Sequence, residues 1–378
     1  MRALRAALAA LAALAALLAA CGAAAAAPIA SLQDDNLVNV SGPALDARLD
    51  ALAATGAKAT RVDVLWREVA QTRPADARDP ADPAYDWSRY DQIVRGLAAR
   101  GVATLMDFYL TPEWASRTGS PTAAPRAADG ARFAAALARR YSGTFAAGGG
   151  ALPEVRRIEV WNEPNLPGFW NPQCRRGPHG KALLVSPSAY ASLLAASYRE
   201  IKTANPRAIV VGGAAGPAGA SPTACPTDGR AAVGSLDFVR RVADEGPPID
   251  AWSMHIYPIG SPLQAFFVPS WSTLPQVIRQ VDRLAPGAPI HITETGYHTS
   301  YNRFHRYFVS EEQQAAWVDE TMVAASRNPR VQLVTWFNFQ DNPRWTGGLL
   351  RVDGTRKPAY ARFAAAAAAF PPPPGWGP

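Results

Sequence analysis

The fold is decided by a stretch of three segments, IDAWSMHIY at 249–257, LPQVIRQVDRL at 274–284 and IHITE at 290–294. The two outer segments are short and rich in apolar, β-branched and aromatic residues, which favours strands. The middle segment repeats apolar residues at helical spacing. A strand, a helix and a further strand in this order indicate one β/α unit of a parallel sheet.

The same alternation continues along the chain in both directions and gives eight units. The first predicted strand lies somewhere within 29–40, and the other predicted strands lie at 59–66, 102–109, 157–162, 208–213, 249–257, 290–294 and 331–339. The predicted helices lie at 44–55, 87–100, 129–141, 187–205, 236–245, 274–284, 311–326 and 359–370. These repeats predict an α/β fold, a TIM (β/α)8 barrel that forms a single domain over residues 29–370.

A doubly wound parallel sheet is the alternative architecture. Such a sheet often carries Gly-x-Gly-x-x-Gly between its first strand and helix. The sequence has no such motif there, and its glycine-rich segment 212–219 contains Pro217 with no helix directly after it. The length of 378 residues is also ordinary for one barrel domain. We therefore expect the barrel.

The charge pattern argues against binding to nucleic acid. The net charge is +7, and all but four of the 38 basic residues are Arg. These residues are scattered singly and in pairs rather than gathered in a basic run, so the sequence lacks the footprint of a nucleic-acid surface. We expect no nucleic-acid partner and a monomer.

Residues 1–27 are typical of a secretory signal, with two Arg among the first five residues and an Ala/Leu run over 6–20. The run is shorter than the roughly 20 residues of a membrane-spanning helix, and no later stretch is long enough. The segment LAAC, which ends at Cys21, resembles a bacterial lipobox, so Cys21 is a candidate for lipidation. Cleavage at an Ala-x-Ala site near residue 27, which removes Cys21, is the alternative. We expect a bacterial protein that is secreted or attached to the outer face of the membrane only by a lipid.

Cys174 and Cys225 lie far downstream, in Pro/Gly-rich segments that follow the fourth and fifth predicted strands. In an oxidising compartment these two residues can pair. A disulfide between them would connect neighbouring loops at one face of the barrel. The Pro/Gly-rich tail at 371–378 is expected to be disordered.

Two glutamates follow predicted strands at the face where barrels place their chemistry. Glu163 follows the fourth strand and Glu294 ends the seventh. These strands are three positions apart on a ring of eight, so the two carboxylates face each other across the mouth. Hydrolysis of a glycosidic bond needs such a pair, an acid on one side of the sugar and a nucleophile or base on the other. Burial of two neighbouring carboxylates also raises the pKa of one of them, as the acid requires at neutral pH.

The two motifs resemble those of clan A glycoside hydrolases. They read WNEPN at 161–165 and, 131 residues after Glu163, ITETGY around Glu294. The sequence is most similar to family 39, with family 5 as the second choice, and YDWSRYD at 85–91 extends the resemblance. It covers 29–370 and implies a retaining glycosidase of the O-glycosyl hydrolase type, with a (β/α)8 catalytic domain and no cofactor.

The resemblance implies a role for each matching residue. Glu163 corresponds to the general acid/base and Glu294 to the nucleophile. Asn162 corresponds to the residue that hydrogen-bonds the 2-hydroxyl of the sugar, and Tyr257 to the partner of Glu294. His255 lies beside Tyr257 in the sequence.

Two further matches concern the second and eighth strands. Arg61 corresponds to the arginine that keeps the nucleophile ionised, a role suited to a fixed cation. Trp336 corresponds to the aromatic floor under the sugar. The third strand departs from the family 5 pattern because it reads MDFY at 106–109, where a His is usual. This departure affects the expected sugar contacts and not the two carboxylates.

Each of these residues also has a structural interpretation. Glu163 could mark the start of a helix, since acidic residues favour the first turn. Arg61 could form a structural ion pair, and His255 and Trp336 could belong to the core. Asp63 and Asp107 are expected to support the site from behind or to have structural roles, rather than to be catalytic.

Aromatic residues in loops after the second, third and fourth strands are candidates for stacking on sugars. Loop packing is their alternative role. These residues are Trp66, Trp114, Phe169 and Trp170.

The sequence contains no motif that is typical of metal, thiol, serine-nucleophile or phosphate-binding sites. It has no His-Glu-x-x-His, no Cys-x-x-Cys, no Gly-x-Ser-x-Gly and no phosphate-binding Gly-Lys-Ser/Thr. His291, His298 and His305 are close in sequence, but the first opens a strand and the others lie in a loop. We expect no metal site.

The sequence therefore predicts an exported retaining glycoside hydrolase that acts on an extracellular oligo- or polysaccharide by double displacement. Two alternatives remain, a non-catalytic glycan-binding barrel anchored to the envelope and a transglycosylase that uses the same residues. The sequence does not choose the sugar, the linkage, or exo rather than endo action.

Overall fold

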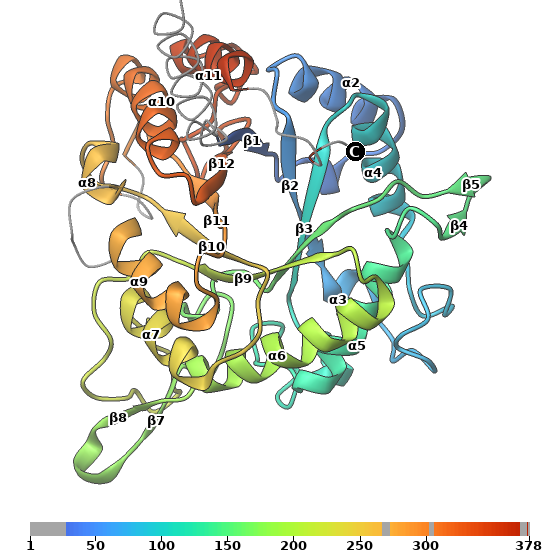
Figure 1. Cartoon of the computed structure of the whole chain (residues 1–378), viewed down its shortest axis with the longest axis vertical. Coiled ribbons are helices and arrows are strands. Elements are labelled where there is room, and N and C mark those ends of the chain that lie inside the picture. Colours follow the sequence, from blue (N-terminus) through green and yellow to red (C-terminus); the bar gives the residue numbers. More distant parts are fainter. Residues whose placement is uncertain (1–27, 267–272, 302–305, 371–375, 377–378) are drawn as a thin grey trace, which may run out of the picture.

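A computed structural model describes residues 28–266, 273–301, 306–370 and 376. Eight parallel strands close into a barrel in the ring order β1-β12-β11-β10-β9-β6-β3-β2 (Figure 1). The strands are β1 (Ile29–Gln33), β2 (Ala59–Leu65), β3 (Ala103–Tyr109), β6 (Arg157–Val160), β9 (Ile209–Ala215), β10 (Ala251–Ile256), β11 (Ile290–Thr295) and β12 (Val331–Phe337). The predicted TIM barrel is confirmed, and the alternative of an open doubly wound sheet is wrong because β1 pairs with β12.

Helices surround the strands, one after each barrel strand in the chain (Figure 1). This arrangement buries both faces of every strand, which is why the strand segments read as nearly continuous apolar runs. The helices are α2 (Gly42–Ala53), α4 (Ser88–Ala99), α5 (Ala127–Arg140), α6 (Ser186–Ala204), α7 (Ser235–Glu245), α9 (Leu274–Leu284), α10 (Glu311–Ser326) and α11 (Pro358–Ala369).

Several predicted boundaries and short elements differ from the structure. The first strand, expected somewhere within 29–40, occupies Ile29–Gln33, and Leu37–Asn39 forms a 3-10 turn after it. The second strand ends at Leu65, and the short helix α3 (Trp66–Val69) follows. Three further short elements were not predicted, because runs this brief carry no measurable periodicity. They are the hairpins β4 (Ala146–Ala147) with β5 (Gly150–Ala151) and β7 (Cys174–Arg176) with β8 (Ala182–Leu184), and helix α8 (Pro262–Phe266).

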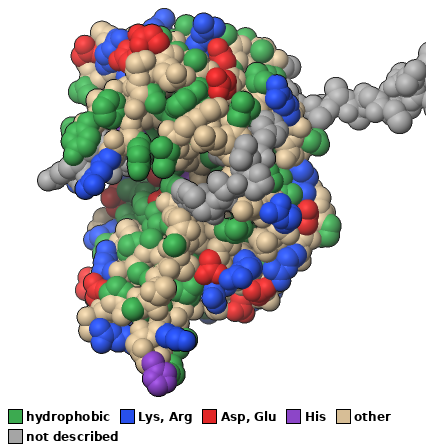
Figure 2. All heavy atoms as spheres, turned by 90° about the vertical axis from the view of Figure 1, so that its left-hand side faces the viewer, with side chains coloured by type: hydrophobic (Ala, Val, Ile, Leu, Met, Phe, Trp, Pro, Cys, Tyr) green, Lys and Arg blue, Asp and Glu red, His purple; other side chains and the backbone are tan. Residues whose placement is uncertain are grey.

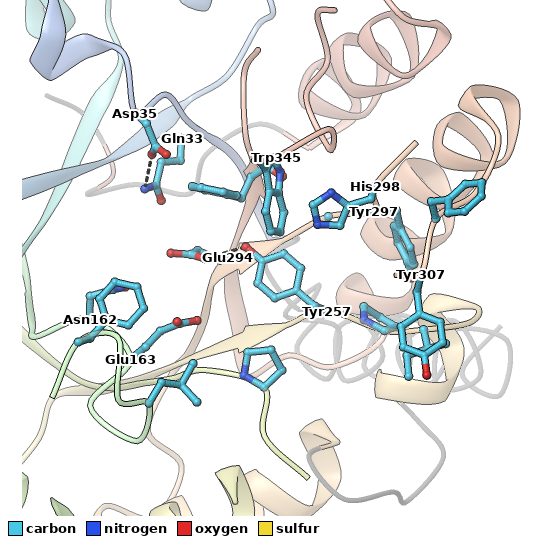
Figure 3. Close-up of a pocket in the computed structure, with 18 of the residues that line it drawn as sticks. Gln33, Asp35, Asn162, Glu163, Tyr257, Glu294, Tyr297, His298, Tyr307 and Trp345 are labelled. Carbon is cyan, nitrogen blue, oxygen red and sulfur yellow. Dashed lines mark hydrogen bonds between the residues drawn. The ribbon is translucent and has the colours of Figure 1, made fainter. Parts of the chain in front are cut away.

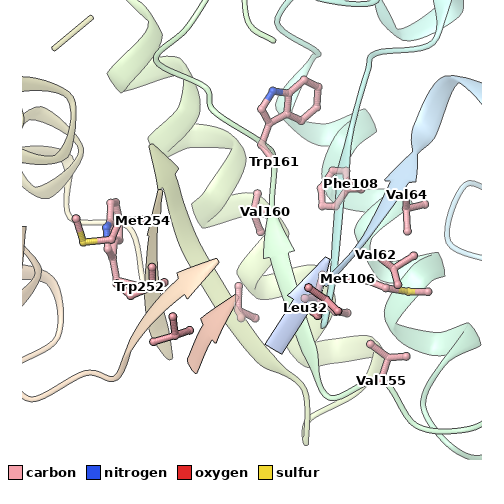
Figure 4. Close-up of a cluster of buried hydrophobic side chains, with 14 of the residues drawn as sticks. Leu32, Val62, Val64, Met106, Phe108, Val155, Val160, Trp161, Trp252 and Met254 are labelled. Atoms are coloured by element: carbon pink, nitrogen blue, oxygen red, sulfur yellow. The ribbon is translucent and has the colours of Figure 1, made fainter. Parts of the chain in front are cut away.

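Successive residues of a barrel strand face two different environments. The outward residues pack against the helices in a buried apolar layer, which includes Val62, Met106 and Trp161 (Figure 4). The inward residues form layers along the barrel axis. The lowest layer is apolar and consists of Ile29, Ala59, Ala103, Leu105 and Leu333.

The next inward layer is charged, unlike the branched aliphatic layers that usually fill such barrels. Arg61 of β2, Asp107 of β3 and Glu159 of β6 are all buried there. A buried charge is tolerated only when it is paired, so these residues must be part of one network. That network supports the site at the carboxyl ends of the strands.

Trp376 closes the amino-terminal end of the barrel. Its ring is 6% exposed and belongs to the lowest apolar layer. The guanidinium carbon of Arg157 lies 3.1 Å from the ring centroid, and His291 contacts the ring at a centroid distance of 5.8 Å. The predicted disorder of the tail is therefore wrong for Trp376, while the rest of 371–378 lies outside the described residues.

The predicted disulfide is present and joins Cys174 of β7 to Cys225 in the loop after β9. Both loops lie at the carboxyl ends of barrel strands, which places the disulfide at the same face as the two glutamates. The predicted signal at 1–27 and Cys21 lie outside the described residues. Within the described ranges, no helix has the length and apolar character needed to cross a membrane.

Lys and Arg side chains are interspersed with Asp and Glu on the face shown in Figure 2. No single-sign stripe of charge covers the described part of this face. The arrangement agrees with the scattered basic residues of the sequence.

Candidate active site

The WNEPN motif forms the turn that follows β6. Trp161 and Glu163 both have positive φ angles, 74° and 42°, a conformation that residues with a β-carbon seldom adopt. The Trp161 indole is buried and donates a hydrogen bond to the Phe169 carbonyl oxygen at 3.1 Å. Such local strain persists when the surroundings fix the backbone, and it concentrates at functional sites.

Asn165 ties this turn to the loop after β9. Its Oδ1 accepts a hydrogen bond from the Gly216 amide at 2.8 Å, and its Nδ2 donates to the Gly216 carbonyl oxygen at 2.9 Å. Gly216 lies directly under Glu163, because a β-carbon at residue 216 would come within 2.6 Å of the Glu163 carboxyl group. The absence of a side chain at Gly216 therefore provides the space that Glu163 occupies.

Glu163 and Glu294 face each other at the mouth of the barrel (Figure 3), and His255 contacts both carboxylates. One oxygen of each carboxylate and a ring nitrogen of His255 all lie within 4.8 Å of one another. His255 Nδ1 is 2.9 Å from Glu163 Oε1 and 3.4 Å from Glu294 Oε2. Burial disfavours the imidazolium, but Glu294 and then Glu163 outweigh this effect and raise the pKa of His255.

Glu294 is held by two donors. Tyr257 donates its hydroxyl to Glu294 Oε2 at 2.7 Å, and Arg61 Nη1 donates to Oε1 at 3.0 Å. Burial raises the pKa of Glu294 to about 6, although His255 and Arg61 favour the ionised form. At neutral pH, Glu294 is therefore mostly a carboxylate.

Arg61 is the hub of the charged layer below the pair. Its Nε donates to Glu159 at 2.7 Å, and its Nη2 donates to Asp107 and to the Asn162 side-chain oxygen, both at 2.9 Å. Its Nη1 is shared among Gln33, Asp63 and Glu294. Burial raises the pKa of Asp107 well above its ordinary value, even though Arg61 opposes the shift.

The two glutamates open into a cavity of about 660 Å³. This volume lies within the range of small-molecule sites. One part of the wall is polar and the other is mostly apolar. The lining residues are Gln33, Asp35, Asp63, Tyr109, Asn162, Glu163, Leu166, Phe169, Pro217, Tyr257, Pro258, Ile259, Glu294, Gly296, Tyr297, His298, Arg306, Tyr307, Phe308, Val309, Phe337 and Trp345.

The structure brings together most of the residues predicted from the strand ends. Asn162, Glu163, Tyr257 and Glu294 line the cavity. Arg61 and His255 lie behind the wall and contact the carboxylates that do. Arg61 donates to the side-chain oxygen of Asn162 and so fixes the orientation of this amide. The NH2 group of Asn162 is therefore left to donate to a ligand.

The predicted aromatic residues do not line the cavity, with the exception of Phe169. Trp66 is fully buried and stacks on Phe133, and Trp170 is 1% exposed and packs against Trp161. Neither ring has a free face, so the prediction that they stack on sugars is wrong. Trp114 packs against Trp66, and its indole donates to the Ala70 carbonyl oxygen.

Trp336 faces the helix layer instead of the cavity. It is 2% exposed, packs near Tyr297 and donates its indole N–H to the Gly347 carbonyl oxygen. The next residue, Phe337, faces inward and lines the cavity together with Trp345. The aromatic residue expected in the cavity wall at Trp336 is therefore found one residue later, at Phe337. Consecutive residues of a strand point to opposite faces, so a shift of one residue exchanges the cavity for the helix layer.

Gln33 and Asp35 are lining residues that the sequence pattern did not identify. Gln33 ends β1 and Asp35 follows it, but the sequence placed the first strand only somewhere within 29–40 and did not fix where it ends. A shorter first strand would have placed them at the carboxyl end, beside the other polar residues. Asp63, expected to be supporting or structural, also lines the cavity while it pairs with Arg61.

Among the described residues, the one group of three potential metal ligands is Glu163, His255 and Glu294. A histidine that binds a metal almost always donates its other ring N–H to a partner. The other ring nitrogen of His255, Nε2, is buried without a partner among the described residues. His291 packs under Trp376, His298 contacts Thr346, and His305 lies outside the described residues.

Comparisons with known proteins show which folds this chain resembles. No family model matches the sequence, and a search of curated proteins also gives no match. A family 39 glycoside hydrolase from the gut symbiont Bacteroides cellulosilyticus WH2 aligns with 22% identity and a TM-score of 0.60, over 90% of this chain and 64% of that chain. This chain thus spans less than two thirds of that enzyme.

Two further structures are similar. A GH39 β-xylosidase from Caulobacter crescentus has 22% identity and a TM-score of 0.60, over 91% of this chain and 72% of that chain. GH5_18 from Streptomyces cattleya, in complex with GlcNAc, has 16% identity and a TM-score of 0.64, over 92% of this chain and 82% of that chain. The predicted resemblance, to family 39 first and family 5 second, is thus confirmed at the level of the barrel fold.

Proposed function

We propose that this protein is an exported glycoside hydrolase that cleaves O-glycosidic bonds with retention of configuration. The observation that carries the proposal is the pair Glu163 and Glu294, which have oxygens within 4.8 Å of each other. In retaining enzymes the two carboxyl groups are about 5 Å apart, whereas inverting enzymes leave a wider gap for water. The contacts of Arg61 and Tyr257 with Glu294 support its role as the nucleophile.

The reaction has two displacements. In the first, a Glu294 oxygen forms a bond to the anomeric carbon, the bond to the leaving oxygen breaks, and Glu163 transfers its proton to that oxygen. In the second, Glu163 takes a proton from water, the water oxygen bonds to the anomeric carbon, and the ester bond to Glu294 breaks. Both residues return to their starting state.

The test is a pair of substitutions combined with trapping of the intermediate. Glu294→Gln removes the nucleophile and is expected to lower kcat by at least about 10⁴-fold on aryl glycosides. Glu163→Gln is expected to slow substrates with poor leaving groups most, because they need the acid. Glu312→Gln, on an exposed residue of α10, is the matched control.

A 2-deoxy-2-fluoro glycosyl fluoride is expected to add one sugar mass to Glu294, as seen by mass spectrometry of peptides. Failure of a panel of such reagents to label Glu294, together with full activity of Glu294→Gln, would remove the assignment. A labelled protein excludes a purely glycan-binding barrel. NMR of the first anomer formed distinguishes retention from inversion, and the ratio of hydrolysis to transfer distinguishes a hydrolase from a transglycosylase.

Two further measurements test the remaining parts of the proposal. Activity is expected to persist in a chelator, because the unpartnered His255 Nε2 does not favour a metal at Glu163 and Glu294. Export is tested by mass spectrometry of the mature amino terminus. A lipid on Cys21 supports an anchored protein, and a new terminus near residue 28 supports free secretion.

A further inference from the structure

A second group of carboxylates occupies the polar part of the cavity. Asp35 and Asp63 both line it, and Gln33 lies between them (Figure 3 shows Gln33 and Asp35). Gln33 Nε2 donates to Asp35 Oδ1 at 3.1 Å and to Asp63 Oδ1 at 3.2 Å. Gln33 is itself oriented by Arg61, which donates to its Oε1 at 3.1 Å. The two aspartates are thus held at fixed positions on either side of one amide.

The mechanism proposed above uses neither aspartate, and Asp35 also differs from its neighbour Asp34. Asp34 is buried and forms an ion pair with Arg48, away from the cavity wall. Asp35 is half-buried and has no cation within hydrogen-bonding distance among the described residues. Burial, followed by repulsion from Asp63 and Glu294, raises the pKa of Asp35 to about 8. The three carboxyl groups therefore interact across the same space.

Resting on the proposed function, we infer that Asp35 and Asp63 bind hydroxyl groups of the sugar that reacts at Glu294 and select uncharged rings over uronic acids. Asp63, paired with Arg61, offers a charged acceptor for sugar hydroxyls, and hydrogen bonds to charged groups are the stronger ones. Asp35, whose raised pKa keeps it mostly protonated at neutral pH, can both donate to and accept from a hydroxyl. Asp35 Oδ2 has no partner among the described residues. The wall thus offers hydrogen-bonding groups for sugar hydroxyls next to Glu294.

Uronic acids are rejected because no described residue with a positive charge lines the cavity beside Asp35 and Asp63. Arg61 is the fixed cation nearest to Glu294, but it is 1% exposed and does not line the cavity. A guanidinium has five N–H groups, and every nitrogen of Arg61 already donates to protein acceptors. A sugar carboxylate would therefore meet the carboxylates of Asp63 and Glu294 in this part of the described site, with no positively charged group free to pair with it.

The remaining basic lining residues do not change this balance. Arg306 is adjacent in sequence to Tyr307, which Figure 3 shows on the far side of the cavity from Asp35. His298 lies near the same side and contacts Trp345 and Thr346. Among the described lining residues, a positive group is thus available only to the part of a substrate that is distant from Asp35 and Asp63.

The test compares substrates that differ only at one carbon. Aryl β-glucoside is paired with β-glucuronide and aryl β-galactoside with β-galacturonide, so that CH2OH is exchanged for a carboxylate. The native protein is expected to favour the uncharged member by at least about 100-fold in kcat/KM, the effect of roughly two hydrogen bonds to charged groups. Equal rates on both members of the pairs would overturn the inference.

The variants Asp35→Asn and Asp63→Asn test whether these two aspartates cause the preference for uncharged substrates over uronides. For uncharged substrates, each is expected to raise KM by about 10-fold or more with a smaller change in kcat. The preference over uronides is expected to fall by about 10-fold in Asp63→Asn, which removes a negative charge. It is expected to change less in Asp35→Asn, because the raised pKa of Asp35, about 8, keeps this carboxyl mostly protonated at neutral pH. Asp46→Asn, on the exposed side of α2, is the control and keeps the native preference. If both variants keep the native KM and the native preference for uncharged substrates over uronides, the aspartates do not have this role.

Binding to the inactive Glu163→Gln protein separates this inference from the proposed function. Saturation-transfer NMR with glucose, galactose, xylose and mannose, each beside glucuronic or galacturonic acid, is expected to detect the uncharged sugars and not the acids. Equal or preferential binding of the acids, or binding of none of these sugars, overturns the inference. Labelling of Glu294 by the fluorosugar in the same preparation leaves the proposed function standing in either case.

Discussion

Glu163 is positioned by its own backbone and by the absence of a side chain beneath it. Its φ of 42° turns the carboxyl group from the end of β6 toward the cavity. Its amide donates to the carbonyl oxygen of Ala214, a residue that also has a positive φ, at 2.9 Å. Gly216, held by Asn165, completes this arrangement. The position of Glu163 thus depends on a residue that has no side chain.

Gly216→Ala is expected to lower kcat/KM by about 100-fold, since a displacement of roughly 1 Å at a reacting group has an effect of that size. The new β-carbon would come within 2.6 Å of the Glu163 carboxyl group, so the glutamate must shift. Steady-state kinetics measures the loss. Gly219→Ala is the control, because a β-carbon there meets nothing within 4 Å. Native activity in Gly216→Ala would show that Glu163 is not held in this way.

The acidic limb of the pH profile is expected to report on Glu294. The pKa of this carboxyl is raised to about 6, and only its ionised form can attack. Below this pKa the group takes up a proton, so kcat/KM is expected to fall by about 10-fold per pH unit. Because His255 lowers the pKa of Glu294, His255→Asn is expected to move this limb to higher pH. A limb that stays in place would assign it to another group.

At the residue scale, the sequence predicted the groups that follow from strand ends and missed those that depend on register. Arg61, Asn162 and Tyr257 could be placed because each belongs to a clear strand or motif. Trp336 was assigned to the wrong face because β12 is apolar on both faces, so its composition does not reveal which residues point inward. Gly216 could not be found, since its role is a contact of 2.6 Å that only the folded chain creates.

At the scale of elements, the charged layer connects three strands beneath the site. Glu159 of β6 accepts from Arg61 of β2 at 2.7 Å and from the Thr293 hydroxyl of β11 at 2.9 Å. Thr293 directly precedes Glu294. The layer therefore fixes the relative position of the strands that carry Arg61 and Glu294, although Glu159 itself does not line the cavity.

Glu159→Gln is expected to destabilise the protein by about 2–4 kcal/mol, because Arg61 is fully buried and loses one of its charged partners. Denaturant unfolding measures the change in the free energy of unfolding. Glu68→Gln breaks an exposed ion pair with Arg89 and is expected to change that free energy by less than about 1 kcal/mol. Equal effects of the two variants would mean that the layer contributes no special stability.

At the scale of the whole molecule, the barrel could be predicted because its signal is repeated eight times. An error in one boundary, such as the end of β2, does not alter the order of the ring. The hairpins and the position of Trp376 could not be predicted, because each arises once and depends on contacts distant in sequence. A Pro/Gly-rich tail suggests disorder, yet the Trp376 ring within it packs on the lowest apolar layer of the barrel and against the Arg157 guanidinium.

Trp376 lies at the end of the barrel opposite to the candidate site, so it is expected to affect the stability of the protein and not its activity. The ring covers the floor of Ile29, Leu105 and Leu333, while the two glutamates lie at the opposite, carboxyl ends of the strands. Burial beside Arg156 lowers the pKa of Arg157 under this ring, so loss of the ring would admit water to a poorly solvated guanidinium. That gain in solvation offsets part of the packing that is lost.

Trp376→Ala is therefore expected to reduce the free energy of unfolding by about 1–3 kcal/mol, less than the roughly 3–5 kcal/mol typical of a buried Trp. Truncation after residue 370 is expected to have the same effect as Trp376→Ala, and both proteins are expected to keep native kcat/KM. Calorimetry measures the melting temperature, with Val352→Ala, an exposed residue, as the control. A melting temperature equal to that of the native chain in both proteins would show that the ring does not occupy the floor in solution. A loss of activity without a loss of stability would instead connect the floor to the site through the charged layer between them.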